Sequence, residues 1–350
     1  MLPQQAIATR LGISRSAVAG HIMNLTHKGL IKGRGYVLSE SPFITVVGGA
    51  NIDIHGKSQQ ALLAEDSNPG SVHISAGGVA RNIAENLARL GVDCRLISAV
   101  GKDHHGEMLL RLSREAGIDM QHVLVTASAP TSTYLSVLDH SGKMQVAIAD
   151  MNIIDQLNVE FLKPQQAMLS QSALIVVDTN LATDSIAWLT DSFATTPIFA
   201  DTVSATKALR LKPHLHSIHT LKTGTLEVEA LTGLKARTQK QLNNVADQLH
   251  DDGVDRVFIT RGEQGVFYSS HDGRGMQSLN RDDREIDNVG GAGDAFLAGL
   301  AYSWMENWPI EETVQFALAA ADITLSHAAT NNPALSIDTI NQLLELQHAG

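Results

Sequence analysis

From Phe43 onward, short apolar runs rich in β-branched residues alternate with longer amphipathic stretches. The runs are FITVVGGANIDI, CRLISAVG, ALIVVDTN, TPIFADT, SIHTLKT and RVFITRG. The stretches between them include GGVARNIAENLARLG, HGEMLLRLSREAG, TDSIAWLTDSFA and TQKQLNNVADQLHDDG. Alternation of this kind predicts an α/β fold, with a mostly parallel central sheet covered by helices on both faces. In such sheets ligands gather at the carboxyl ends of the strands.

One segment departs from this alternation. Residues 131–151, TSTYLSVLDHSGKMQVAIADM, predict an antiparallel hairpin that turns at Asp139–Gly142. We expect it to belong to a small β lid, with lid strands near residues 50–75 and 130–150.

Charge divides the chain of 350 residues into two modules. Residues 1–39 carry five basic and no acidic side chains, a charge of +5, whereas the net charge of the whole chain is −11. We therefore predict a small domain over residues 1–40 and a large one over 43–345. A single cysteine excludes an intrachain disulfide framework, and we find neither a leader nor an apolar run of membrane-spanning length. We expect a cytoplasmic protein with no membrane partner.

The basic module has apolar residues at helical spacing on both sides of Gly12, followed by a short hairpin over Ile31–Leu38. This order resembles the winged helix-turn-helix domains of bacterial regulators, although the helix that usually precedes Gln4 is missing or reduced to MLP. The resemblance implies DNA binding, in which the second helix enters the major groove and the wing contacts phosphates. The alternative is an appendage that only packs or oligomerises. The expected DNA contacts are Arg15, Ser16, His21, Lys32 and Arg34.

Near the carboxyl terminus, residues 287–300 read DNVGGAGDAFLAGL, a glycine-rich turn that opens an apolar helix. Such a turn directs unpaired backbone N–H groups outward, and these favour a bound anion. The P-loop requires Lys and then Ser or Thr after its last glycine, but Asp294 and Ala295 stand there. A carboxylate beside an anion hole suits deprotonation of a hydroxyl during phosphoryl transfer. Asp294 is equally suited to capping the helix.

Five strings occur in an order that resembles the ribokinase-like sugar and nucleoside kinases of the PfkB family over about residues 43–340. They are GGANIDIHG, SAGGVARNIAENLARLG, TLKTGTLEVEALTG, ITRGEQGVF and DNVGGAGDAFLAGL. The resemblance implies a ribokinase-like fold and an ATP-dependent phosphotransferase that acts on an alcohol group.

The resemblance also implies roles for individual residues. Asp294 takes the place of the catalytic base, and Gly291, Ala292 and Gly293 form the anion hole with it. The expected sugar-binding residues are Asn51, Asp53, Gly77, Gly78 and Asn82. The expected ATP and phosphate contacts are Lys222, Glu227, Thr260, Gly262 and Gly265, with Glu227 also near Mg²⁺ through water. The alternative to substrate binding is that Asp53 caps the end of a strand and that Asn82 is only a polar residue in the first turns of a helix.

Three positions depart from the family pattern. Gly224 replaces the Asn of an Asn-x-x-Glu motif, and Gly290 replaces the Thr before Gly-Ala-Gly-Asp. Asn288 stands where many ribokinases place an Asp near a monovalent cation, so K⁺ is a candidate beside ATP and Mg²⁺. Loss of an amide and a hydroxyl favours a second hypothesis, a transcription regulator whose kinase-like domain senses a ligand. Restoring Asn and Thr is then expected to raise the rate.

The substrate is predicted from the turn GGVARN, which has Val79 where ribokinases have Lys. Removing that cation leaves room for a nucleobase. The string GGVARNIAENLARLG, taken with AIADM, DTN at 178–180, DTVSATKA and NNPALS, resembles bacterial pseudouridine kinases. We therefore expect phosphorylation of pseudouridine to pseudouridine 5′-phosphate; the third hypothesis is a ribose or fructose kinase. Asp150 and Asn152 either contact the base or only end a strand, and Asn180 is a further expected substrate contact. We also expect a homodimer.

Overall fold

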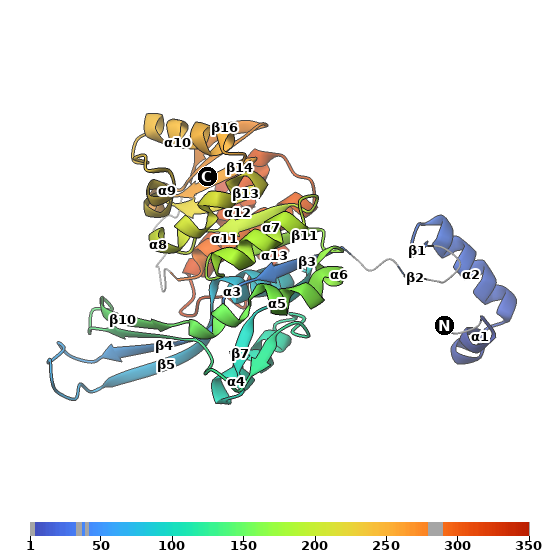
Figure 1. The fold of residues 1–350 in the computed structure, drawn as a ribbon, viewed down its shortest axis with the longest axis horizontal. Coiled ribbons are helices and arrows are strands. Elements are labelled where there is room, and N and C mark those ends of the chain that lie inside the picture. The colour runs from blue at the N-terminus through green and yellow to red at the C-terminus, as the bar shows by residue number, and fades with distance from the viewer. Residues whose placement is uncertain (1–3, 33–36, 39–41, 279–289, 350) are drawn as a thin grey trace. The chain divides into compact units, whose positions relative to one another are not determined.

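The computed structural model describes residues 4–32, 37–38, 42–278 and 290–349. The chain divides into two compact units, Met1–Pro42 and Phe43–Gly350 (Figure 1). Among the described residues, no helix has both the length and the apolar character needed to cross a membrane.

The first unit contains α1 (Gln4–Leu11), α2 (Arg15–His27) and the antiparallel strands β1 (Ile31–Lys32) and β2 (Val37–Leu38). Ser14 caps α2, because its Oγ accepts a hydrogen bond of 3.1 Å from the Ala17 amide. Arg15, Ser16 and His21 are exposed on α2. Lys32 lies in β1, and Arg34 is outside the described residues.

The second unit is built on an eight-stranded sheet in the order β16-β15-β14-β13-β12-β11-β3-β6. Six strands are parallel to one another, β15 is antiparallel to β14, and the edge strand β16 is antiparallel to β15. The parallel strands are β3 (Phe43–Val47), β6 (Asp93–Ile97), β11 (Leu174–Asp178), β12 (Ile198–Asp201), β13 (Thr220–Gly224) and β14 (Arg256–Thr260). The antiparallel edge consists of β15 (Val266–Ser270) and β16 (Gly273–Gln277). The mostly parallel α/β sheet expected from the alternation is confirmed.

Each face of this sheet has its own core, since alternate residues of a strand point to opposite faces. In β11, Ile175 and Val177 pack with α7 (Thr183–Ser192), α9 (Thr225–Thr232) and α10 (Gln239–Asp251). Leu174 and Val176 pack on the other face with α3 (Val79–Arg89), α4 (His104–Glu115), α11 (Ala292–Met305) and α12 (Ile310–Leu325). The near-continuous apolar character of the strands follows from this double burial. Helix α13 (Ile337–Ala349) packs against α12.

Four strands form a second sheet, here called the lid sheet, in the order β10-β9-β4-β5. They are β4 (Asn51–Ser58), β5 (Gly70–Gly77), β9 (Thr133–Leu138) and β10 (Met144–Asp150). Figure 1 shows these strands extending away from the α/β body of the unit. Strands β9 and β10 are antiparallel, and the Gly142 amide donates 2.9 Å to the Asp139 carbonyl, so the hairpin and its turn are confirmed.

Two predicted runs are each divided between two sheets, which corrects the sequence analysis. FITVVGGANIDI forms β3 in the central sheet and then β4 in the lid sheet, and CRLISAVG forms β6 and then β7 (Ala99–Gly101), which pairs with β8 (Leu124–Thr126). The first break lies at Gly48, where a Cβ would collide with the carboxyl group of Asp178. Apolar character continues through each break because both sides are buried.

Short helices complete the connections of the second unit. They are η1 (Asn152–Gln156), α5 (Val159–Leu162), η2 (Lys163–Gln165), α6 (Gln166–Leu169), α8 (Ala205–Ala208), η3 (Leu209–Ser217) and η4 (Gly262–Gln264).

Candidate active site

The glycine-rich turn begins α11 at the place expected from the sequence. Gly291 is the residue before the helix and has a left-handed backbone with φ of 79°, a conformation that glycine adopts without strain. A Cβ at Gly291 would also collide with the Thr330 carbonyl, so glycine is required here on both grounds. Ala292 and Gly293 follow in the first turn, whose amides have no partner within the helix. The turn is therefore a suitable anion site.

Asp294 lies at the start of α11 with 8% of its surface exposed. Its Oδ2 accepts a hydrogen bond of 2.9 Å from the Asn82 Nδ2. Asn82 belongs to α3, 212 positions earlier in the chain. Helices α3 and α11 pack against each other, and this packing brings the proposed base to a residue expected to bind the acceptor.

Lys222 provides a cation beside the glycine-rich turn. It lies in the middle of β13, and its Nζ donates 2.8 Å to Asp201 Oδ2, which ends the neighbouring strand β12. The two residues are register partners in this parallel pair. A Cβ on Gly293 would lie 2.6 Å from Lys222 Nζ, so the turn leaves open the space next to the ammonium group. An anion held there would contact both the amides and the cation.

The ionisation of Asp294 depends on these neighbours. Burial raises the pKa of the Asp294 carboxyl to about 8, and Asp201 and then Asp178 raise it through repulsion. Lys222 and the bond from Asn82 act in the opposite direction. Burial also lowers the pKa of Lys222, but Asp201, Asp294 and Glu227 outweigh burial and raise it. A carboxylate with a pKa near neutral pH is suited to accept a proton from an alcohol.

Asn51, Asp53, Gly77 and Gly78 come together where the lid sheet joins the α/β body. Asn51 pairs with Gly77 across β4 and β5, and Asn51 Nδ2 donates 2.6 Å to Asp53 Oδ1. A Cβ on Gly77 would collide with the Asp53 carboxylate. Gly78 has φ of 100° and begins α3. Burial raises the pKa of Asp53, opposed by Asn51, His55 and Arg81.

Asp178 is a site residue that was not predicted from the sequence, although it directly follows an apolar run and ends β11. Its buried carboxyl accepts the amides of Gly49 at 2.8 Å and Ala80 at 3.0 Å. It also accepts the Asn180 amide at 2.8 Å. Burial raises the pKa of Asp178. This one carboxyl group connects the end of β3, the start of α3 and the loop after β11.

Asn180 lies on the same side of the site as Gly49 and Met151. A Cβ on Gly49 would lie 2.7 Å from Asn180 Nδ2 and 3.3 Å from the Met151 methyl group. Asn180 Oδ1 accepts 2.6 Å from Lys207 Nζ, a second residue that the sequence analysis did not single out. Asp150 and Asn152 flank Met151 at the end of the lid sheet, where they are exposed and hydrogen-bonded to each other at 3.0 Å.

The expected ATP residues lie around the ends of β13 and β14. Glu227 is in the first turn of α9, and a Cβ on Gly224 would collide with its carboxylate. Thr260 ends β14 as the register partner of Gly224, and its Oγ1 donates 3.3 Å to the Thr223 carbonyl. Gly262 and Gly265 form the following turn, with φ of 58° and 81°. Gly290 is described just before the glycine-rich turn, whereas Asn288 lies outside the described residues.

The central sheet, the lid sheet and a buried carboxyl group at a glycine-rich helix start define a class, the ribokinase-like α/β kinases. The model of the pfkB family of carbohydrate kinases matches residues 41–337. The chain therefore belongs to the pfkB family, whose members are phosphotransferases that act on an alcohol group.

Two bacterial relatives are similar over most of their length. A pseudouridine kinase of Escherichia coli strain K12 is 40% identical over 308 residues, covering 88% of this chain and 98% of the relative. The uncharacterized sugar kinase YeiI of the same strain is 37% identical over 346 residues, covering 99% of this chain and 95% of the relative. The second alignment thus extends into the basic amino-terminal unit.

Solved structures share the fold. Arabidopsis thaliana ribokinase, solved with ribose and ATP, has a TM-score of 0.76 at 21% identity and covers 88% of this chain and 99% of its own. An Escherichia coli structure of the same fold, at 16% identity and a TM-score of 0.76, holds ATP and Mg²⁺ and covers 87% of this chain and 100% of its own. The fold therefore accommodates the nucleotide and the metal.

Proposed function

We propose that this kinase transfers the γ-phosphoryl group of ATP to a nucleoside hydroxyl, with pseudouridine as the acceptor and pseudouridine 5′-phosphate as the product. The observation that carries the proposal is the buried Asp294 carboxyl, bonded to Asn82 at the first turn of α11. The 40% identity to a pseudouridine kinase supports the choice of acceptor.

In this mechanism Asp294 accepts the proton of the acceptor hydroxyl as its oxygen bonds to the γ-phosphorus and the bond to the ADP oxygen breaks. Lys222 and the amides of Gly291 to Asp294 offset the charge that develops on the phosphoryl oxygens. Asn51, Asp53 and Asn82 hold ribose hydroxyls. Glu227 would hold Mg²⁺ through water, and the metal would supply charge neutralisation at the phosphates.

The base side of the site is formed by Asn180, Lys207, Asp150 and Asn152. Together they offer amide and ammonium donors and a carboxylate acceptor to the carbonyl and N–H groups of a uracil ring. A site built from such groups discriminates against a ligand that leaves them unpaired. Free ribose, which lacks the base, is therefore expected to be a weak acceptor.

An ATP-consumption assay with nucleosides and pentoses, in the presence of Mg²⁺ and K⁺, tests the proposal. We expect kcat/KM for pseudouridine to exceed that for uridine and for ribose by about tenfold or more. A preference for ribose or fructose would identify a free-sugar kinase. No turnover with any acceptor would favour a ligand sensor, the hypothesis that Gly224 and Gly290 support.

We further propose that the basic unit binds DNA. The support is its charge of +5 and the exposure of Arg15, Ser16 and His21 on one short helix. Lys32 and Arg34 would contact phosphates from the hairpin. A regulator and an enzyme are then combined in one chain, which leaves the kinase mechanism unchanged.

We also propose a homodimer formed through the lid sheet. The face opposite to Asp53 carries a continuous apolar set, here called the outer lid face. Its residues share one face because they are register partners across β5, β4, β9 and β10. Val72 and Ile148 are 66% and 61% exposed. The outer lid face consists of Ile54, Val72, Ile74, Leu135, Val146 and Ile148. A patch of this kind marks an interface, and a flat sheet face can pair with its own copy about a twofold axis.

A further inference from the structure

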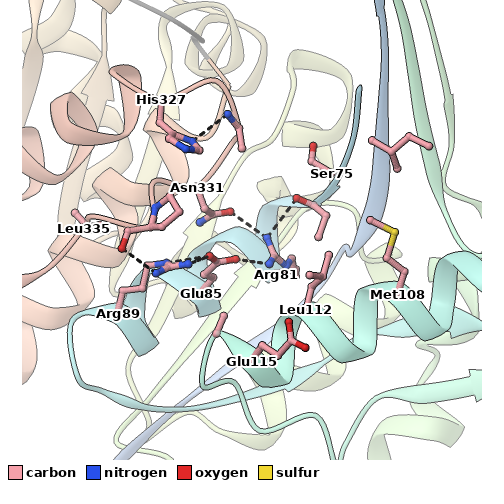
Figure 2. Close-up of a pocket in the computed structure, with 15 residues that line it drawn as sticks. Ser75, Arg81, Glu85, Arg89, Met108, Leu112, Glu115, His327, Asn331 and Leu335 are labelled. Atoms are coloured by element: carbon pink, nitrogen blue, oxygen red, sulfur yellow. Dashed lines mark hydrogen bonds and ion pairs between the residues drawn. The ribbon is translucent and has the colours of Figure 1, made fainter. Parts of the chain in front are cut away.

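Arg81 precedes Asn82 in α3, and its side chain is only 5% exposed. Its Nη1 donates to three acceptors in different parts of the unit, and Figure 2 shows the bond to Asn331. These are the Ala76 carbonyl at 3.3 Å, the Asn82 Oδ1 at 3.3 Å and the Asn331 Oδ1 at 3.1 Å. One guanidinium thus connects the end of lid strand β5, the residue that bonds Asp294, and the loop after α12.

The remaining donors of Arg81 are also directed to protein atoms. Nε donates 3.3 Å to Ser113 Oγ on α4, and Nη2 forms an ion pair with Glu85. Glu85 is paired with Arg89 as well, one turn further along α3. Because its donors are engaged in this way, Arg81 is suited to hold other residues in place and not to bind substrate.

Asn331 extends the same network to the anion hole. Its Nδ2 donates 3.0 Å to the Asn82 carbonyl and 3.0 Å to Asn86 Oδ1, which fastens the loop to α3. The preceding residue, Thr330, presents its carbonyl to Gly291 so closely that no side chain fits between them. The position of the glycine-rich turn therefore depends on a loop that Arg81 and Asn331 hold.

The amide group of Asn82 has two possible orientations, and only one is compatible with the ionised form of Asp294. Arg81 Nη1 donates to Asn82 Oδ1 at 3.3 Å. The Thr330 hydroxyl lies 3.5 Å from the same oxygen and 3.4 Å from the Ala76 carbonyl, and its one proton is shared between these two acceptors. This leaves Nδ2 to donate to the Asp294 carboxylate. The flipped amide would instead place Oδ1 against the carboxylate and Nδ2 against the guanidinium, which are two unfavourable contacts.

We infer that Arg81 is a positioning residue. It sets the orientation of Asn82 toward Asp294, and it holds the loop behind the anion hole. The acceptor site and the phosphate site thereby keep a fixed distance and orientation relative to each other. This inference rests on the proposed kinase function and adds to it a residue that contacts neither substrate. Misplacement of reacting groups by about 1 Å costs about 10²-fold in rate, so loss of Arg81 is expected to act mainly on kcat.

The test compares Arg81→Met with Arg89→Met in steady-state kinetics. Arg81→Met removes the guanidinium donors to Asn82 and Asn331, while Glu85 keeps Arg89 as its partner. We expect kcat to fall about 10- to 10²-fold with KM for ATP nearly unchanged. Arg89→Met removes the other partner of Glu85 and a contact to the Pro333 carbonyl but leaves the bonds to Asn82 and Asn331 in place, so it is expected to leave kcat within about twofold.

The pH profile separates positioning from a loss of stability. The groups that act on Asp294 are Lys222, Asp201 and Asp178 from three strands and Asn82 from α3, of which Asn82 and Lys222 lower its pKa. If Arg81→Met allows Asn82 to turn away from Asp294, the pKa of Asp294 rises because it loses that hydrogen bond. The acidic limb of the pH–rate profile then moves to higher pH. A purely structural defect lowers the amount of folded enzyme and leaves that limb in place.

Two more variants make the outcome decisive. Arg81→Lys keeps the charge beside Glu85 without the forked donors, so we expect restored thermal stability and a kcat still well below wild type. Asn331→Leu is expected to resemble Arg81→Met, and the double variant to be little worse than either, because both act through one network. Wild-type kcat in Arg81→Lys, or additive losses in the double variant, would refute the inference. Absence of turnover in the wild type would instead refute the proposed function.

Discussion

Among single residues, Asp294 has two candidate roles: its carboxylate is either the catalytic base or a cap of helix α11. Asp294→Asn keeps the shape of the side chain and the amides of the turn but cannot accept a proton. We expect turnover to fall by about 10²- to 10⁴-fold, with ATP affinity nearly unchanged in a direct binding measurement. A variant that keeps more than about a tenth of the wild-type rate would show that Asp294 mainly caps α11.

The same residue predicts how rate and stability change with pH. The pKa of Asp294 is raised to about 8, so kcat/KM is expected to rise with pH and level off above about 8. Because the folded state holds the Asp294 proton more tightly than the unfolded chain does, this carboxyl contributes its full stability at pH values below its pKa in the unfolded chain. That contribution is lost as the pH rises through about 8, the pKa in the folded state. Asp294→Asn should therefore melt higher than wild type at pH 8.5, by about 2 °C or more, with a smaller difference at pH 5. Calorimetry at the two pH values checks the sign.

Variants at Gly224 and Gly290 test whether the departures from the family pattern lower the kcat of this kinase. Restoring the pattern by Gly290→Thr is expected to raise kcat, by up to about 10²-fold if the hydroxyl acts on the phosphoryl group. Gly224→Asn, which the family pattern alone predicts to raise kcat, is instead expected to lower it, because its Cβ would displace the Glu227 carboxylate. Steady-state rates of the two single variants and the double variant distinguish these effects. A higher rate in Gly224→Asn would show that Glu227 relaxes without loss.

At the scale of elements, the lid sheet presents different chemistry on its two faces. Asp53 and His55 share one face with Ser75 and Ser136, whereas the outer lid face is apolar. Ile148→Lys is expected to weaken a dimer by about 10²-fold or more, because each copy would bury an unpaired charge.

Light scattering across a concentration series measures the dimer. Leu346→Lys, at a residue 72% exposed on α13, is the matched control and should leave the mass unchanged. A wild-type chain that is monomeric at every concentration would contradict the proposed dimer.

At the scale of the whole molecule, two units of opposite charge are expected to have different partners. If the basic unit binds DNA, two or more phosphate contacts would give a slope of about −1.8 or steeper for log affinity against log salt concentration. Arg34→Ala should weaken binding to all sequences alike, whereas changes at Ser16 or His21 should alter sequence preference.

Fluorescence anisotropy with the full-length chain measures this binding. Genomic fragments from the neighbourhood of the gene are compared with random DNA, with and without nucleoside. Equal binding to both kinds of DNA would remove the regulatory part of the proposal and leave the kinase unaffected.

The α/β class, the start of α11 at the glycine-rich turn and the residues that follow each strand can be predicted without coordinates, because they depend on local periodicity and on turn chemistry. Tertiary structure decided which of those residues meet. Asp294 contacts Asn82 only because α3 packs on α11, and Lys222 meets Asp201 only because β12 and β13 are neighbours in register. The division of FITVVGGANIDI between two sheets was likewise invisible in hydrophobicity, since both halves are buried. Local patterns specify elements, but contacts across 212 positions depend on how those elements pack.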